Sequence, residues 1–123
     1  MQQDGWNLDK VDMDSVGRPE DRREHDRVPG PFDGRRVGLL DTPVRIYDLS
    51  KGGCLVHAMH EQTVGIPVTL KIDLPFEGWI TVEAEVAYCK EGFGFAVRFL
   101  DMDETTTARL GRSIDKLMTG VKP

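Results

Sequence analysis

Arg23 and Arg27 stand four residues apart in a segment whose basic residues are arginines. Five of the ten arginines of the chain fall between Arg22 and Arg36, and no lysine accompanies them. At this spacing the two side chains share one side of the chain, whether the backbone is helical or extended. A guanidinium group binds phosphate oxygens bidentately, stacks on flat rings and pairs with the O6 and N7 edge of guanine. The cluster therefore predicts a specific anion site that suits a guanine nucleotide.

The second chemical segment is Asp48-Leu49-Ser50-Lys51-Gly52-Gly53. Asp48 ends a predicted strand, and Ser50 opens a turn that Gly52 and Gly53 complete. Glycine permits positive backbone dihedrals and close approach of a ligand to the main chain. The Asp48 carboxylate could accept hydrogen bonds from guanine N1 and N2, and the Ser50 hydroxyl could donate to a phosphate or base. Asp and Ser also cap ordinary turns. The two segments together indicate one binding site for a small anionic nucleotide. The protein is therefore expected to be a ligand sensor rather than an enzyme.

The elements that must position these segments are predominantly strands. From Val37 onward, apolar and polar residues alternate with the period of a half-buried strand. Several short strands at roughly ten-residue spacing, each with a polar face, predict a small antiparallel β-barrel of about six strands. A barrel leaves few free edges in a chain of this size. The arginine segment before Val37 lacks a core-forming pattern, so no strand is expected there. The expected strands lie at 44–47, 53–59, 68–74, 80–88 and 93–99, with Tyr88 in the apolar series of its strand.

The pattern changes to helical spacing near the C-terminus. Leu110, Ile114 and Leu117 predict one helix at about 103–118, capped by Asp103 or Asp101 and stopped by Gly120. We expect residues 22–118 to form a single domain that includes the arginine segment 22–36. Residues 1–21 contain few apolar side chains and are expected to be a flexible tail. Residues 119–123 form a second short tail.

Composition excludes several functional classes. The net charge of −5 over 123 residues argues against a general nucleic-acid surface. No apolar run approaches the ~20 residues that membrane insertion needs, and the N-terminus lacks a secretory pattern, so a cytoplasmic protein is expected. Cys54 and Cys89 stand in apolar strand contexts, which predicts two buried free thiols in a reducing compartment.

No metal or catalytic centre is predicted. His57 and His60 are three apart, which places them on opposite faces of a strand, and His25 lies in the arginine segment. No Ser-His-Asp or Cys-His arrangement has supporting context. Trp79 follows a turn at a strand start and is expected at the barrel rim. Arg35 and Arg36 lack motif support and are expected to give electrostatic support only.

The chain resembles the PilZ domain family. The resemblance rests on Arg23-x-x-x-Arg27, on Asp48-x-Ser50-x-x-Gly53, and on the barrel with its C-terminal helix, over about residues 20–118. The strand at 93–99 also resembles the last strand of that family. The resemblance implies binding of the bacterial second messenger cyclic di-GMP without a cofactor, with Arg22 helping to hold an intercalated ligand dimer. The ligand-binding residues so expected are Arg22, Arg23, Arg27, Asp48, Ser50, Gly52 and Gly53.

The leading hypothesis is a cyclic di-GMP receptor in which the ligand orders residues 22–36 against the turn. The changed surface would then signal to a downstream protein, and the family resemblance suggests motility, adhesion or exopolysaccharide control. One alternative is an adaptor of the same fold that binds proteins without nucleotide. Another is a barrel that binds single-stranded nucleic acid, which the net charge and the lack of an exposed aromatic row on the strands oppose.

Overall fold

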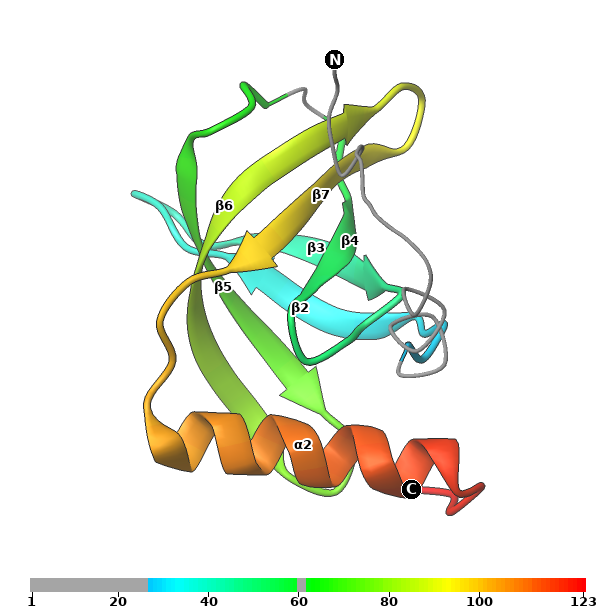
Figure 1. The fold of residues 1–123 in the computed structure, drawn as a ribbon. Coiled ribbons are helices and arrows are strands. Elements are labelled where there is room, and N and C mark those ends of the chain that lie inside the picture. Colours follow the sequence, from blue (N-terminus) through cyan, green and yellow to red (C-terminus); the bar gives the residue numbers. More distant parts are fainter. Residues whose placement is uncertain (1–26, 60–61) are drawn as a thin grey trace, which may run out of the picture.

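The computed structural model describes residues 27–59 and 62–123 and contains a closed antiparallel barrel of six strands with one C-terminal helix (Figure 1). Around the barrel the strands follow the order β2-β3-β4-β7-β6-β5. The fold class expected from the alternation is therefore confirmed. The strands are β2 (Phe32–Arg36), β3 (Thr42–Tyr47), β4 (Gly53–His57), β5 (Pro67–Leu74), β6 (Gly78–Lys90) and β7 (Gly94–Phe99), and the helix is α2 (Glu104–Met118).

The core fills the barrel with the inward-facing residues of each strand. In β5 the alternation predicted from Val68 to Leu74 is observed, because every second residue is buried. β5 and β6 form the longest ladder, from Pro67 opposite Glu85 to Leu74 opposite Gly78. Burial of aliphatic side chains of this size stabilises a fold by roughly 1.5–3 kcal/mol each.

Helix α2 lies across one end of the barrel (Figure 1). Asp103 is its N-cap and accepts a hydrogen bond from the Thr106 backbone N–H at 2.7 Å, whereas Asp101 lies outside the helix. Leu110 and Ile114 are buried in the core of the barrel. Past the last turn, Gly120 adopts a φ of +86°, which suits a glycine at a helix end. In the part of the chain that the structure describes, no helix is long and apolar enough to cross a membrane.

Strand β2 corrects the expectation that the segment before Val37 contains no strand. Its sequence, Phe-Asp-Gly-Arg-Arg, carries one large apolar residue, so it shows no alternation. Pairing with β3 on one side and β5 on the other forms the strand instead. Gly34 is required because a Cβ there would lie 2.8 Å from the Ile46 Cγ1 atom. Tertiary contacts thus override a weak local signal.

Strand β6 corrects the expected positions of Tyr88 and Cys89. A register shift between Val86 and Tyr88 places Tyr88 opposite Ala96, although Val86 lies opposite Val97. This β-bulge reverses the alternation. Tyr88 therefore leaves the inward series of its strand and is 37% exposed. Cys54 is buried as predicted, but Cys89 is exposed, and its thiol donates to the Gln62 carbonyl oxygen.

Candidate ligand site

The turn after β3 is held by its own side chain. The Ser50 hydroxyl accepts hydrogen bonds from the backbone N–H groups of Gly52 and Gly53, both at 3.2 Å, and donates to the Gly53 carbonyl oxygen at 3.2 Å. Ser50 is 8% exposed. Asp48 adopts a φ of +51°, a left-handed conformation that aspartate tolerates better than most residues. Ser50 consequently shapes the turn, and the Asp48 carboxylate is the polar group that the turn presents.

Gly52 and Gly53 meet different surroundings. A Cβ at Gly53 would lie 2.2 Å from the Val97 carbonyl oxygen, because β4 and β7 pair closely there. A Cβ at Gly52 would meet no atom within 4 Å. Gly53 is therefore explained by the barrel itself, whereas Gly52 leaves an open face of the turn.

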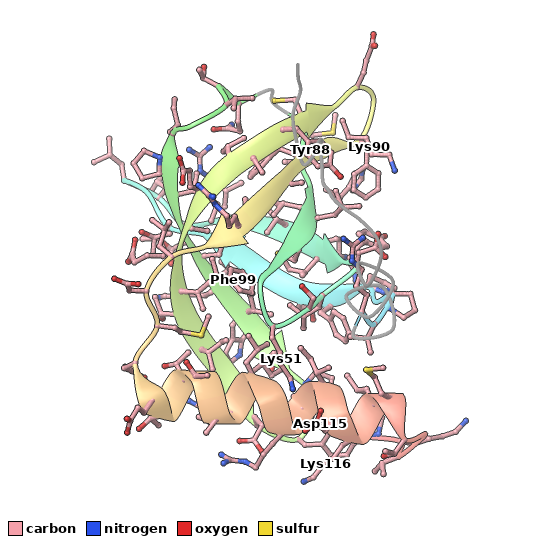
Figure 2. All side chains as sticks on the ribbon, in the orientation of Figure 1. Lys51, Tyr88, Lys90, Phe99, Asp115 and Lys116 are labelled. Carbon is pink, nitrogen blue, oxygen red and sulfur yellow. The ribbon has the colours of Figure 1, made fainter. Side chains whose placement is uncertain are left out.

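The turn is also fastened to the helix end of the barrel. The Phe99 N–H donates to the Gly52 carbonyl oxygen at 2.8 Å, and the Lys51 ammonium lies 3.6 Å from the Asp115 carboxylate. Figure 2 shows Lys51 beside α2 near Asp115. These contacts fix the turn between β7 and α2.

Backbone pairing brings the end of the arginine segment to this turn. Val28 and Leu49 exchange two hydrogen bonds of 2.9 and 2.8 Å, and the Asp48 N–H donates to the Pro29 carbonyl oxygen at 3.2 Å. Val28 and Leu49 are both buried in the core. Arg27, directly before Val28, is exposed. Arg22 and Arg23 lie outside the described residues, so the structure joins only one arginine of the motif to the turn.

Tyr88 lies within electrostatic reach of this candidate site, and sequence reasoning missed it. Burial raises the pKa of the Tyr88 hydroxyl, the positive charge of Arg27 lowers it, and the negative charge of Asp48 raises it. Both charged groups are therefore close enough to act on the phenol. Within the described residues, no hydrogen bond or ion pair engages the side chain of Arg27 or of Asp48. No alternation pattern could have revealed Tyr88, because the bulge that turns it outward depends on pairing with β7.

A row of outward side chains crosses four strands beside the turn. Tyr47 of β3 pairs with Leu55 of β4, Leu55 with Ala96 of β7, and Ala96 with Tyr88 of β6. The row therefore has two small or aliphatic residues between two tyrosines. Leu55 and Ala96 are covered, at 9% and 5% exposure, so the tyrosines at the two ends are the members of the row that offer ring surface to a base.

Next to the row, aromatic rings form a cluster that the sequence analysis did not expect. The ring centroids of Tyr47 and Phe93 are 5.3 Å apart, those of His57 and Phe93 are 4.8 Å apart, and the Lys90 ammonium lies 5.3 Å from the Phe93 centroid. Strand pairing gathers these residues from three separate segments, which a search for aromatic spacing along one strand does not detect.

The remaining predicted features lie elsewhere. Arg35, Arg36 and Trp79 line a cavity, and none of the predicted ligand-binding residues that the structure describes lines it with them. Among residues 27–59 and 62–123, no group of three His, Cys, Asp or Glu side chains could hold a metal ion. His57 belongs to the aromatic cluster, whereas His25 and His60 lie outside the described residues.

The family model of the PilZ domain matches residues 21–116. The chain belongs to the PilZ domain family. Its members are receptor domains, and the match covers both motif segments and the barrel. No curated protein sequence matches the chain.

Solved structures of PilZ proteins share the fold. The Bacillus subtilis inhibitor of motility MotI/DgrA superposes with a TM-score of 0.64 at 19% identity, covering 78% of this chain and 51% of that one. The PilZ domain of YcgR from Escherichia coli, solved with c-di-GMP, superposes with a TM-score of 0.59 at 18% identity, and the match covers 76% of this chain and 88% of that one. The PilZ domain of CeSA from a cellulose-synthesizing bacterium superposes with a TM-score of 0.51 at 20% identity, and the match covers 77% of this chain and 96% of that one. This chain thus spans about half the length of MotI/DgrA.

Proposed function

We propose that this protein is a cyclic di-GMP receptor and not an enzyme. The observation that carries the proposal is the backbone bridge between Val28 and Leu49, which joins the arginine segment to the Asp48–Gly53 turn. Arg27 and Asp48 carry opposite charges that act on one phenol, and no described side chain pairs with either. A guanine base needs both a donor and an acceptor, and this arrangement supplies both.

In this proposal the site residues have different roles. The Asp48 carboxylate accepts from the guanine N1 and N2 groups, while Arg22, Arg23 and Arg27 bind phosphate oxygens and the other base edge. Ser50 and Gly53 hold the turn in shape, since the Ser50 hydroxyl is bonded within it and Gly53 packs on β7. Gly52 leaves the turn open to the ligand. Tyr47 and Tyr88, at the two ends of the row, offer rings on which a base stacks.

Signalling would follow from the position of the arginines after ligand capture. Residues 28–36 already hold a bridge and strand β2, so this part of the segment 22–36 does not depend on the ligand for its structure. The altered surface would be read by a downstream protein. The similarity in fold to an inhibitor of motility supports a motility protein as a candidate for this partner.

Titration calorimetry with cyclic di-GMP tests the receptor proposal. The wild type should release or absorb heat saturably at ligand concentrations on the order of 10 µM, and Arg23→Ala and Asp48→Ala should each weaken binding by about tenfold or more. Asp101→Ala is the matched control, because Asp101 is exposed and lies outside the site. Absence of heat for the wild type would favour the adaptor of the same fold. One ligand per chain would contradict the dimer-holding role of Arg22.

A further inference from the structure

The cavity lined by Arg35, Arg36 and Trp79 lies at the opposite end of strand β3 from the Asp48–Gly53 turn. Strand β3 begins at Thr42, but β4 pairs with it only over Arg45–Tyr47. After His57 the chain turns toward β7, where the Ala58 N–H donates to the Phe93 carbonyl oxygen at 3.1 Å. The barrel wall is therefore open beside Thr42–Val44. A cavity of about 570 Å³ occupies this place, lined by Val44 on one side and Ala58 on the other.

The cavity combines positive charge with an apolar lining. The lining includes three arginines, Arg35, Arg36 and Arg45, and one carboxylate, Asp33. With histidine neutral, the net charge of the lining is therefore +2. Asp33 lies 3.4 Å from Arg45. Within the described residues, the side chains of Arg35 and Arg36 take part in no hydrogen bond or ion pair. A positive cavity is notable in a chain whose net charge is −5.

The apolar part of the lining is built from the core and from Trp79. Val44 and Phe95 are core residues of the barrel, and Trp79, at the start of β6, is 47% exposed. Cavities of about 300–1,000 Å³ with mostly apolar walls and a few convergent polar groups are the usual form of small-molecule sites. Unpaired guanidinium groups beside such walls select an anion attached to an apolar body.

We propose that this cavity is a second ligand site, which binds a small organic anion with a phosphate or carboxylate head and an apolar body. Arg35 and Arg36 alternate between the two faces of β2 and both line the cavity, so either guanidinium group can pair with the head. The body would contact Met59 and Trp79, which are the exposed large apolar residues of the lining. The two charged residues, for which the sequence indicated only electrostatic support, thereby gain a specific role. The site is separate from the proposed nucleotide site, because none of the described residues assigned to cyclic di-GMP, which are Arg27, Asp48, Ser50, Gly52 and Gly53, lines the cavity.

Trp79 provides the reporter for the test. In a Trp6→Phe background, Trp79 is the remaining tryptophan of the two in the chain. Its fluorescence should change saturably with n-hexyl phosphate or with hexanoate, and the tighter of the two identifies the preferred head. Inorganic phosphate and 1-hexanol, which each carry one half of the ligand, should bind at least tenfold more weakly. No saturable change with either amphiphile would overturn the proposal.

Matched variants separate a specific site from general charge. Arg35→Gln/Arg36→Gln should weaken binding of the preferred amphiphile at least tenfold, whereas Lys116→Gln/Lys122→Gln removes the same charge elsewhere and should leave it unchanged. An equal loss of amphiphile binding in the two double variants would contradict the proposal of a specific site. Should the arginine variant fail to fold, Thr42→Glu, an exposed lining position, brings a negative charge to the cavity and should cause the same loss.

Competition with cyclic di-GMP keeps the two proposals apart. An excess of cyclic di-GMP should leave the bound amphiphile in place, and displacement would show that the cavity is part of the nucleotide site. If cyclic di-GMP does not bind at all, saturable binding of the amphiphile that depends on Arg35 and Arg36 still supports the second site.

Discussion

At the scale of single residues, the main role of Ser50 and Gly53 in the structure is to hold the shape of the turn. The Ser50 hydroxyl has one proton and two lone pairs, and all three are used within the turn. Gly53 lies where the backbone of β7 leaves no room for a Cβ on β4. The Asp48–Gly53 motif, which the sequence suggests is a binding motif, therefore also has a structural role. Loss of Ser50 or Gly53 would disturb the shape of the turn as well as remove a possible ligand contact.

The two glycines of the turn give a paired prediction. Gly53→Ala should lower the free energy of unfolding by about 1–3 kcal/mol, because its Cβ would lie 2.2 Å from the Val97 carbonyl oxygen. Gly52→Ala meets no atom within 4 Å and should change stability by less than about 0.5 kcal/mol. Urea denaturation of both variants measures the difference. Equal stability of the two would contradict the close approach of β4 and β7.

The sequence predicts the residue types of the site better than their arrangement. Asp48, Ser50 and the glycines follow from turn chemistry, and Arg27 follows from its spacing to Arg23. Tyr88 could not be predicted, because strict alternation places it in the core and only the bulge opposite Ala96 turns it outward. Val28 and Leu49, which directly follow Arg27 and Asp48, pair through the backbone although they stand about twenty positions apart, and no local pattern encodes this pairing.

At the scale of elements, α2 is attached to the turn between β5 and β6 through polar contacts. Arg112 donates two hydrogen bonds to the Glu77 carboxylate, at 3.1 and 3.0 Å, and Arg109 donates to the Glu77 carbonyl oxygen. The Ser113 hydroxyl donates to the Pro75 carbonyl oxygen at 2.7 Å. These contacts orient the helix, while Leu110 and Ile114 supply its apolar packing.

Glu77 predicts a pH dependence of stability. Hydrogen bonds from Arg112 hold the pKa of the Glu77 carboxyl below its ordinary value of 4.5. A pKa that is lower in the folded state gives stability that is present above about pH 4.5 and is lost as the pH falls through the folded-state pKa. Glu77→Gln lacks this contribution, so the stability gap between wild type and variant should shrink from about pH 6 to about pH 3.

Urea denaturation across this pH range measures the gap. Glu91→Gln is the control, because Glu91 lies in the exposed turn between β6 and β7 and pairs with no side chain of the described residues. Its stability should run parallel to that of the wild type. A gap for Glu77→Gln that stays constant with pH would show that Arg112 does not favour the charged carboxylate.

Elements with strong periodicity could be predicted from the sequence, and those without it could not. The alternation in β5 and the helical spacing in α2 reflect burial of one face, so the pattern and the structure agree. Strand β2 has one large apolar residue and a glycine, and its position between β3 and β5 replaces the missing pattern. The cavity beside Thr42–Val44 arises from the early end of the β3–β4 ladder, which alternation does not predict.

At the scale of the whole molecule, ligand binding should raise stability through mass action. If cyclic di-GMP binds only the folded protein, a ligand concentration of about one hundred times Kd adds about 2.7 kcal/mol, or roughly 10 °C in Tm. Thermal unfolding followed by circular dichroism measures the shift. Asp48→Ala should lose most of it and Asp101→Ala should keep it, whereas an unchanged Tm in the wild type would contradict the receptor proposal.

The bridge between Val28 and Leu49 has a consequence for affinity under the receptor proposal. Arg23 stands five residues before Val28 in the chain, so it can lie no farther than about 18 Å from that anchor. A ligand that docks on the turn would then meet the arginines at an effective concentration in the millimolar range, as in a bivalent binder. Two weak half-sites joined by a short segment can in this way reach the affinity of one deep pocket. Under this proposal, the number of residues between Arg23 and Val28 helps to set the affinity for the ligand.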